Sequence, residues 1–221
     1  MKVLVFDTET TGLIPSKKSN AEWPHIVQLS CIFINLDRLD EMYVDNFIVN
    51  PEVDIPTVTS DIHGITNEIA KRDGIAIRDV LLRITAWLDE ADVLVAHNLS
   101  FDKRIIEKEL ERNGYPNYFN IREYQIYDTM KEGKDKCNIV MINKRGHGFI
   151  KYPKLAELYK YLFNPKEDCL ELTNAHNAIY DVLMTLRCYL NMNNIQTEID
   201  FDQLYQSYLE KYEEEYEETE D

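Results

Sequence analysis

Hydrophobic and polar positions in the first fifty residues follow the spacing expected of β-strands. Residues 3–6 form a short apolar run with two β-branched valines, which is typical of a strand buried on both faces. Two longer runs, 26–34 and 43–49, are rich in Val, Ile and Phe and enclose the polar turn 35–38. These two runs therefore predict an antiparallel hairpin.

The following part of the chain alternates helical periods with short apolar runs. In the helical segments, apolar residues recur at three- and four-residue steps, whereas the strand segments are uninterrupted runs of aliphatic residues. Glycine and proline mark several of the helix ends. The predicted helices cover 58–65, 75–90, 100–113, 154–163 and 175–190, and the predicted strands cover 93–96 and 121–127.

This order of elements predicts an α/β fold with a mixed sheet. Its five strands would form an antiparallel hairpin beside parallel strands that are connected by flanking helices. Ligands of such sheets bind at the carboxyl ends of the parallel strands. We expect residues 1–195 to form this domain. The glutamate-rich helical period over 198–221 predicts an acidic C-terminal tail, either solvated or packed on the body or on a partner.

The composition of the 221 residues indicates an intracellular protein. Its four cysteines lie far apart without a C-x-x-C pair, so we expect neither disulfides nor a zinc ribbon. No apolar stretch approaches the ~20 residues needed to cross a bilayer. The first apolar run ends at Asp7, which argues against a signal peptide. We expect a cytoplasmic protein, or one at the nucleus or nucleoid.

The net charge of −16 argues against a nucleic-acid partner, but the charge is unevenly distributed. Residues 198–221 hold 11 acids against one lysine, so the rest of the chain carries only −6. Residues 131–154 instead hold seven bases against two acids. Because residues 131–151 show no clear period, we expect a loop or irregular insert there. This basic segment would either guide a nucleic-acid backbone or simply be solvated.

Candidate chemistry begins with two acids at the end of the first strand. Asp7 and Glu9 are spaced i, i+2, so their side chains point to the same side of a strand. Two adjacent anions at the end of a buried strand repel each other and are costly to remove from water. A bound cation would offset both costs. The alternative is a strand end that simply continues into a polar turn.

Two other segments bring further acids to helix starts. Asp102 lies in the first turn of the helix over 100–113, and Asp181 follows His176 by five residues. Taken separately, Asp102 could be a partner of the helix dipole, and the His176–Asp181 segment could be an ordinary surface helix start. Taken together, four carboxylates near one point need about four positive charges, which two divalent cations supply.

Oxygen ligands favour Mg²⁺ or Mn²⁺ over zinc. A pair of such ions suits phosphodiester hydrolysis, and a histidine that titrates near neutral pH suits deprotonation of water.

The three segments 6–13, 97–102 and 176–181 resemble, in order and separation, the exonuclease motifs of a known family. They read Phe-Asp-Thr-Glu-Thr-Thr-Gly-Leu, His-Asn-x-x-Phe-Asp and His-x4-Asp. This pattern is similar to the DEDDh branch of the DnaQ-like 3′–5′ exonucleases. Segments 63–66, 128–129 and 153–158 agree with it. The resemblance covers residues 1–190 and implies an RNase H-like fold.

The resemblance also implies a substrate and a role for each site residue. The substrate would be the 3′ end of single-stranded or frayed DNA, hydrolysed to nucleoside 5′-monophosphates. His176 would be the general base. Two Mg²⁺ (or Mn²⁺) ions would be held by Asp7, Glu9, Asp102 and Asp181. The 3′-terminal nucleotide would be held by Thr10, Thr11, Gly12, Leu13, His63, Asn98 and Phe101.

Three other functions remain to be weighed against this one. An exoribonuclease of the same fold would use the same acids, because the site cuts either sugar. A proofreading subunit would bind a DNA polymerase, with residues 198–221 as the tether. A phosphotransferase with Asp7 as nucleophile is disfavoured, because that chemistry usually uses D-x-D-x-T and leaves the His–Asp motifs unexplained.

Overall fold

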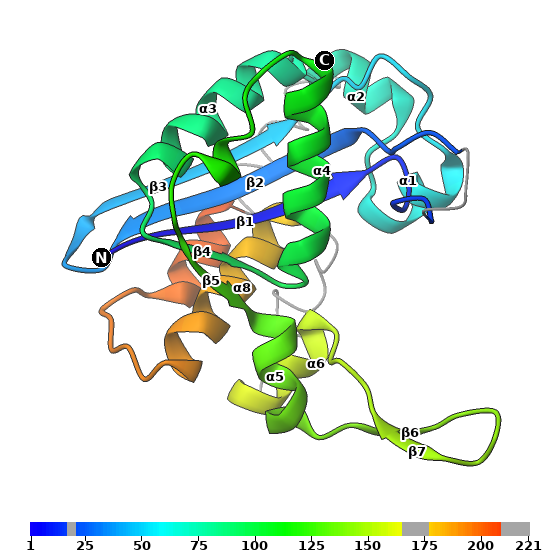
Figure 1. Ribbon diagram of the computed structural model, residues 1–221. Helices are drawn as coiled ribbons and strands as arrows, with labels where there is room; N and C mark the ends of the chain where they lie inside the picture. Colours follow the sequence, from blue (N-terminus) through cyan, green and yellow to red (C-terminus); the bar gives the residue numbers. More distant parts are fainter. Residues whose placement is uncertain (17–20, 165–176, 209–221) are drawn as a thin grey trace.

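The computed structural model describes residues 1–16, 21–164 and 177–208 of the chain. Five strands form one sheet in the order β3-β2-β1-β4-β5 (Figure 1). β1 pairs antiparallel with β2 and parallel with β4, and β4 pairs parallel with β5. The mixed sheet predicted from the sequence is therefore confirmed. The strands are β1 (Lys2–Thr10), β2 (Ile26–Asn35), β3 (Arg38–Ile48), β4 (Val93–Ala96) and β5 (Gln125–Asp128).

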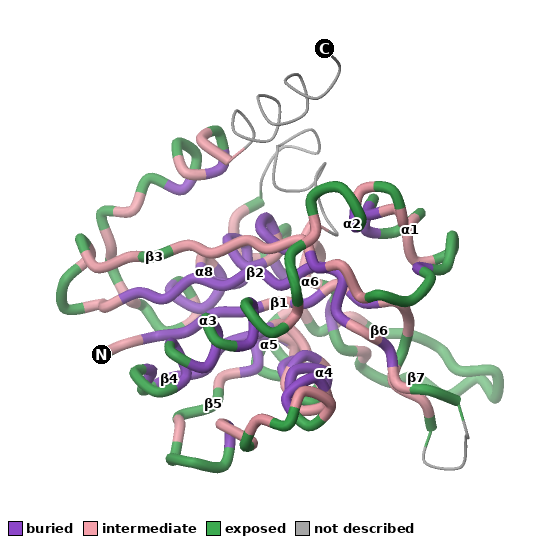
Figure 2. The backbone as a smooth tube through the Cα atoms, turned by 90° about the horizontal axis from the view of Figure 1, so that it is seen from above, coloured by how far each residue is buried: buried purple, intermediate pink, exposed green. Residues whose placement is uncertain are grey.

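Helices cover both faces of this sheet, because the side chains of its central strands alternate between two cores. Leu4 and Phe6 of β1 belong to the core beneath α3 (Ile77–Glu90) and α4 (Leu99–Arg112). Val3 and Val5 belong to the opposite core beneath α6 (Leu155–Phe163) and α8 (Ala178–Met192). Figure 2 shows the buried residues concentrated in β1, β2 and α8. Each fully buried aliphatic side chain contributes about 1.5–3 kcal/mol.

Two short helices and one turn of 3-10 helix complete this region. α1 (Thr57–His63) ends at Gly64, whose φ of 76° fits the predicted glycine stop. α2 (Asn67–Asp73) was not predicted, and it begins where the Thr66 side chain accepts from Ile69 N. η1 (Tyr118–Asn120) lies just before the region in which a strand over 121–127 is predicted. That strand is shorter than predicted, since β5 begins only at Gln125.

The predicted loop over 131–151 is wrong, because this segment is mostly regular structure. α5 (Thr129–Cys137) is capped at its N-terminus by Asp128, whose side chain accepts from two backbone amides. Gly133 in this helix lies against Leu158, where a Cβ atom would come within 2.8 Å. β6 (Val140–Ile142) and β7 (Gly148–Ile150) then form an antiparallel hairpin that projects from the body (Figure 1).

The chain after α8 returns to the body as a helical segment at 201–208. Phe201 and Tyr205 are buried in the α8 core, and the Tyr205 ring stacks on Tyr180 with 6.1 Å between ring centres. The remaining part of the predicted tail, 209–221, lies outside the described residues. Within the described ranges, no helix has both the length and the apolar character needed to cross a membrane.

Candidate active site

The acidic cluster of this protein lies where β1 meets the start of α8. Asp7 and Glu9 lie on β1, opposite Ser30 and Gln28 of β2. Asp181 lies in the first turn of α8. Asp7, Glu9 and Asp181 each offer a carboxylate oxygen, and these three oxygens lie within 4.8 Å of one another. The fold thus brings together acids that are more than 170 residues apart in the sequence.

Asp102 lies beside this cluster, on the first turn of α4. Its carboxylate is 2% exposed and accepts from Thr8 N at 3.0 Å and from Thr8 Oγ1 at 2.7 Å. Thr8 stands between Asp7 and Glu9 on β1, so these two bonds fix α4 directly against the acidic strand. Asp102 is not one of the three acids whose oxygens converge, but its charge raises the pKa of Glu9, and the charge of Asp7 raises the pKa of Asp102.

Removal from water and mutual repulsion both disfavour ionisation of these acids. Burial raises the pKa of Asp7 to about 7. Burial, followed by the charges of the other three acids, raises the pKa of Glu9 to about 9. Burial and the charge of Asp7 raise the pKa of Asp102 well above its ordinary value, although hydrogen bonds from Thr8 oppose this shift.

This donor set fits divalent cations. All four groups are carboxylates, which are hard oxygen ligands, and Asp7, Glu9 and Asp102 form no ion pair with any residue in the described ranges. Cations bound here would relieve the repulsion that raises the pKa of Glu9. The observation that supports a metal centre is therefore the convergence of the Asp7, Glu9 and Asp181 carboxylate oxygens, two of which, those of Asp7 and Glu9, have no basic partner among the described residues.

A buried amide network holds α8 against the sheet beside this cluster. Gln28 Nε2 donates to Asn46 Oδ1 at 3.0 Å and to Asn177 Oδ1 at 3.1 Å, and Gln28 Oε1 accepts from Ala178 N at 3.2 Å. Ser30 Oγ also donates to Asn46 Oδ1. Asn177 is the N-cap of α8, so the network connects the strand next to Glu9 with the helix that carries Asp181.

The segment expected to hold the 3′-terminal nucleotide continues from β1 beyond the acids. Thr10 is buried, and its hydroxyl donates to Gly12 O at 2.7 Å. Thr11 pairs with His25 through both its backbone amide and its hydroxyl. Leu13, in contrast, is 85% exposed. The turn is therefore held at Thr10 and Thr11 and presents an apolar side chain to solvent.

Three further expected residues come from separate elements. His63 is buried at the end of α1, and its Nδ1 accepts from Ile65 N at 3.1 Å. Burial lowers the pKa of His63, whereas the nearby backbone of Thr10 opposes this shift. Asn98 has a left-handed backbone conformation (φ 71°), and its backbone N–H donates to Asp128 Oδ1 at 3.1 Å. Phe101 is partly buried against the core of α3 and α4.

Comparison with known protein families matches residues 4–189 to the Exonuclease model RNase_T. The match spans all three motif segments and most of the chain. The chain belongs to this exonuclease family.

Relatives of this exonuclease domain include much longer proteins. A "DNA polymerase III PolC-type" of Oceanobacillus iheyensis is 30% identical over 184 residues, which are 82% of this chain and 11% of that protein. A "DNA polymerase III subunit epsilon-like protein" of Rhodobacter capsulatus is 37% identical over 105 residues, 48% of this chain and 14% of that protein. The chain thus spans only a small part of these relatives.

Solved structures show the same fold. The zinc-bound complex of E. coli ExoI with single-stranded DNA has a TM-score of 0.65 at 18% identity. The match covers 93% of this chain and 43% of that one. E. coli exonuclease I with a dT13 oligonucleotide has a TM-score of 0.61 at 18% identity, over 86% of this chain and 40% of that one. The α/β, RNase H-like architecture of the exonuclease domain is thereby confirmed.

The expected general base, His176, lies outside the described residues of this exonuclease domain. It directly precedes Asn177, the N-cap of α8. The second motif segment also contains a histidine, His97, and this residue is described by the structure. Its ring lies between Thr129 Oγ1 at 3.0 Å and Pro153 O at 3.1 Å, so it connects β4 with the starts of α5 and α6.

Sequence reasoning missed the amide network of Gln28. The available signal was the presence of polar residues, Gln28 and Ser30, within the otherwise apolar run 26–34. A buried polar side chain needs a partner, so these two residues could have been identified as candidates for a network. Their partners Asn46 and Asn177 could not be identified, because those contacts form only in the folded sheet.

Proposed function

We propose that this chain is a 3′–5′ exonuclease that hydrolyses the last phosphodiester of single-stranded DNA and releases nucleoside 5′-monophosphates. The observation that carries this proposal is the convergence of Asp7, Glu9 and Asp181, with Asp102 beside them, in a domain of the exonuclease family. The DNA-bound structures of E. coli exonuclease I, which have the same fold, support DNA as the substrate.

The four acids would hold two divalent cations, Mg²⁺ or Mn²⁺. When bound, such cations lower the pKa of the attacking water and neutralise charge on the leaving 3′-oxygen. The carboxylates of this chain would fix the positions of the cations. Thr8 holds Asp102 in place, and Gln28 holds the helix that carries Asp181. His176, as in the DEDDh branch, would take the proton of the attacking water at its ring nitrogen.

The 3′-terminal nucleotide would be held by residues around the turn that follows β1. Leu13 would pack against the terminal base, since its side chain is exposed and apolar. Thr10, Thr11 and Gly12 would contact the sugar and phosphate, while His63, Asn98 and Phe101 would line the same pocket. Phe101 would stack on a base, a contact that is tolerant of sequence and is worth about 1–3 kcal/mol.

Single-stranded DNA labelled at its 5′ end, incubated with Mg²⁺, tests this function. We expect stepwise shortening from the 3′ end, nucleoside 5′-monophosphate as product, and loss of activity in Asp7→Asn. Shortening from the 5′ end, or full activity of Asp7→Asn, would overturn the assignment. A matched RNA oligonucleotide in the same assay decides between DNA and RNA, because an exoribonuclease would degrade the RNA faster.

A second candidate function is proofreading within a DNA polymerase. It is favoured by the relatives, which include PolC-type polymerases and an epsilon-like subunit of polymerase III. In this case the chain would act inside the cell at the replicated DNA, and residues 198–221 would bind the polymerase. Co-purification with a replicative polymerase, lost when residues 198–221 are removed, would support it. An equal yield of co-purified polymerase with and without that segment would contradict a tethering role for residues 198–221.

A further inference from the structure

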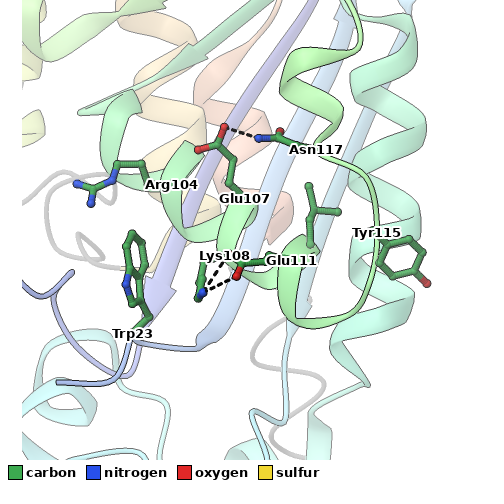
Figure 3. A pocket seen from close by; sticks show the side chains of 8 residues that line it. Trp23, Arg104, Glu107, Lys108, Glu111, Tyr115 and Asn117 are labelled. Carbon is green, nitrogen blue, oxygen red and sulfur yellow. Dashed lines mark hydrogen bonds and ion pairs between the residues drawn. The ribbon is translucent and has the colours of Figure 1, made fainter. Parts of the chain in front are cut away.

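A pocket on the outer side of α4 lies apart from the acidic cluster. It has a volume of about 460 Å³ and lies between α4, Trp23 on the segment before β2, and the loop that follows α4 (Figure 3). Binding sites for small molecules begin at about 300 Å³. The pocket is therefore large enough for one nucleotide unit of a nucleic-acid strand.

Trp23 forms one wall of this pocket, and its backbone is held in place. Arg112 donates to the carbonyl oxygens of Trp23 and Pro24, at 2.6 and 2.9 Å. Arg112 is in turn paired with the buried carboxylate of Glu109 at 2.7 Å. The Trp23 side chain is half-buried, so part of its ring faces solvent. A ring carried on a backbone that is already held stacks on a nucleobase at a lower ordering cost than one on a free segment.

Arg104 supplies the pocket with a cation that lies over the Trp23 ring and has no anionic partner among the described residues. Its guanidinium carbon lies 5.0 Å from the centre of the Trp23 ring. The other charged lining residues are engaged, since Lys108 pairs with Glu111 and Glu107 accepts from Asn117. Arg104 forms neither a hydrogen bond nor an ion pair with any residue that the structure describes. Its planar fork of N–H donors therefore remains available for a phosphate.

Both walls of the pocket are connected to residues that are expected to hold the 3′ end. Phe101, Arg104 and Lys108 are spaced i, i+3, i+7 along one side of α4. At about 1.5 Å per residue, Arg104 lies about 4.5 Å further along the helix axis than Phe101. On the opposite wall, Trp23 is two residues before His25, whose carbonyl accepts from Thr11 N at 2.9 Å.

We propose that this pocket binds a nucleotide upstream of the 3′ end of a single-stranded substrate. Trp23 stacks on its base and Arg104 pairs with its phosphate. The contact reads no sequence, because every base offers a face for stacking. This inference rests on the proposed function and extends it: the enzyme holds its substrate at two places, at the terminal nucleotide and at an upstream one along α4.

Two substrates of different length test the pocket. The p-nitrophenyl ester of thymidine 5′-monophosphate is too short to reach Trp23, whereas (dT)10 spans both places. We expect Trp23→Leu and Arg104→Gln to raise KM for (dT)10 about 5- to 100-fold, the range of one lost stacking contact. Hydrolysis of the short ester should match that of the unsubstituted protein. Arg78→Gln, an exposed arginine on α3, is the matched control.

Two kinetic outcomes would overturn the inference. One is an unchanged KM for (dT)10 in both variants. The other is an equal loss on the short ester, which would mean that the substitutions act on the structure of the site and not on an upstream nucleotide.

Tryptophan fluorescence in EDTA measures binding without hydrolysis. The protein has two tryptophans, and Trp87 is 8% exposed and stacked on Phe33, so quenching by (dT)10 reports Trp23. We expect quenching in the unsubstituted protein, a weaker affinity in Arg104→Gln, and none in Trp23→Leu. Quenching in a protein that hydrolyses neither substrate would support the pocket and contradict the proposed function. Hydrolysis of (dT)10 without quenching would contradict the pocket alone.

Discussion

The side chain of Gln28 accepts a hydrogen bond from the backbone amide of Ala178 at 3.2 Å, although the two residues are 150 positions apart. This bond satisfies one of the amides at the start of α8 that have no partner within the helix. Because Gln28 lies opposite Glu9 and Asp181 lies in the first turn of α8, the bond sets the separation of two acids. We infer that Gln28 is a positioning residue of the candidate site.

Replacement of Gln28 by leucine should weaken both the fold and the reaction. The backbone amide of Ala178 would lose the side chain that accepts from it, and Asn46 would lose one of its donors, at a cost of about 1–3 kcal/mol. We also expect kcat on single-stranded DNA to fall at least tenfold with little change in KM, because the acids move and the nucleotide contacts do not. Urea unfolding and steady-state kinetics measure the two effects.

Gln203→Leu is the matched control for this substitution, because Gln203 is exposed in the helical segment after α8. It should leave stability and kcat unchanged. If Gln28→Leu lost stability but kept its kcat, Gln28 would have a structural role only.

Two substitutions of Asp102 distinguish the effect of its hydrogen bonds with Thr8 from the effect of its negative charge. In Asp102→Asn, the amide oxygen still accepts from Thr8 N and Thr8 Oγ1, while a buried charge next to Asp7 is removed. We expect the metal-free protein to be as stable as before or more stable, and the exonuclease activity to be lost. Asp102→Ala should lose activity and also about 1–3 kcal/mol of stability.

Thermal unfolding with and without Mg²⁺ measures both substitutions at Asp102. The stabilisation by Mg²⁺ should shrink in each variant, because a ligand has been removed. Equal destabilisation of the metal-free protein by both substitutions would contradict the view that the charge of Asp102 destabilises the fold when no metal is bound.

Local patterns were sufficient to predict where the four acids lie in the fold. Asp7 and Glu9 share one side of β1 because side chains alternate along a strand. Asp102 and Asp181 lie in first turns because the helical periods begin just before them. The order of strands and helices was likewise sufficient for the sheet, since parallel strands need helical crossovers.

Contacts between distant parts of the chain explain what the sequence did not reveal. α5 was missed because Gly133 disfavours a helix and the segment has no clear apolar period, whereas packing of Gly133 against Leu158 stabilises it. The hairpin of β6 and β7 was missed because it has exposed residues on both faces and no alternating pattern. The role of His97 was missed because its partners, Thr129 and Pro153, follow it by more than thirty residues.

His97 should make the stability of the fold depend on pH. Burial lowers its pKa from 6.5 to about 4 in the folded protein. Between these values the unfolded chain binds a proton that the folded protein does not, so stability is full above pH 6.5 and falls as the pH decreases toward 4. The largest possible loss is about 3 kcal/mol.

Chemical unfolding of His97→Gln at pH 7 and pH 4.5 isolates this contribution from that of the carboxylates. The variant should lose about 2–3 kcal/mol less than the unsubstituted protein between these two pH values. His147→Gln, at the exposed turn of the hairpin, serves as the control and should follow the unsubstituted protein. Identical pH dependence in all three proteins would contradict the role of His97.

The hairpin of β6 and β7 carries Lys144 and Arg145 at its tip, where both are exposed. If they contact the substrate backbone, the double substitution Lys144→Gln/Arg145→Gln removes up to two phosphate contacts. The slope of log K against log salt should then become shallower by about 0.7 for each contact. Binding of (dT)20 in EDTA between about 50 and 200 mM salt measures this slope. A slope equal to that of Lys71→Gln/Arg78→Gln would contradict contact with the hairpin.

Substitution of Leu13 distinguishes most clearly between an effect on substrate binding and an effect on folding. Its side chain is 85% exposed and covers no core residue, so Leu13→Ala should change the free energy of unfolding by less than about 0.5 kcal/mol. If Leu13 packs against the terminal base, the loss of that contact should raise KM about fivefold or more, both for (dT)10 and for the short thymidine ester. This pattern differs from that of Trp23 and Arg104, where only the longer substrate is affected.

Val58→Ala provides the control for Leu13→Ala, because Val58 is 75% exposed on α1 and its substitution should change neither the free energy of unfolding nor KM. Unchanged kinetics of Leu13→Ala on both substrates would exclude the apolar contact at the 3′ end while leaving the acidic site untouched.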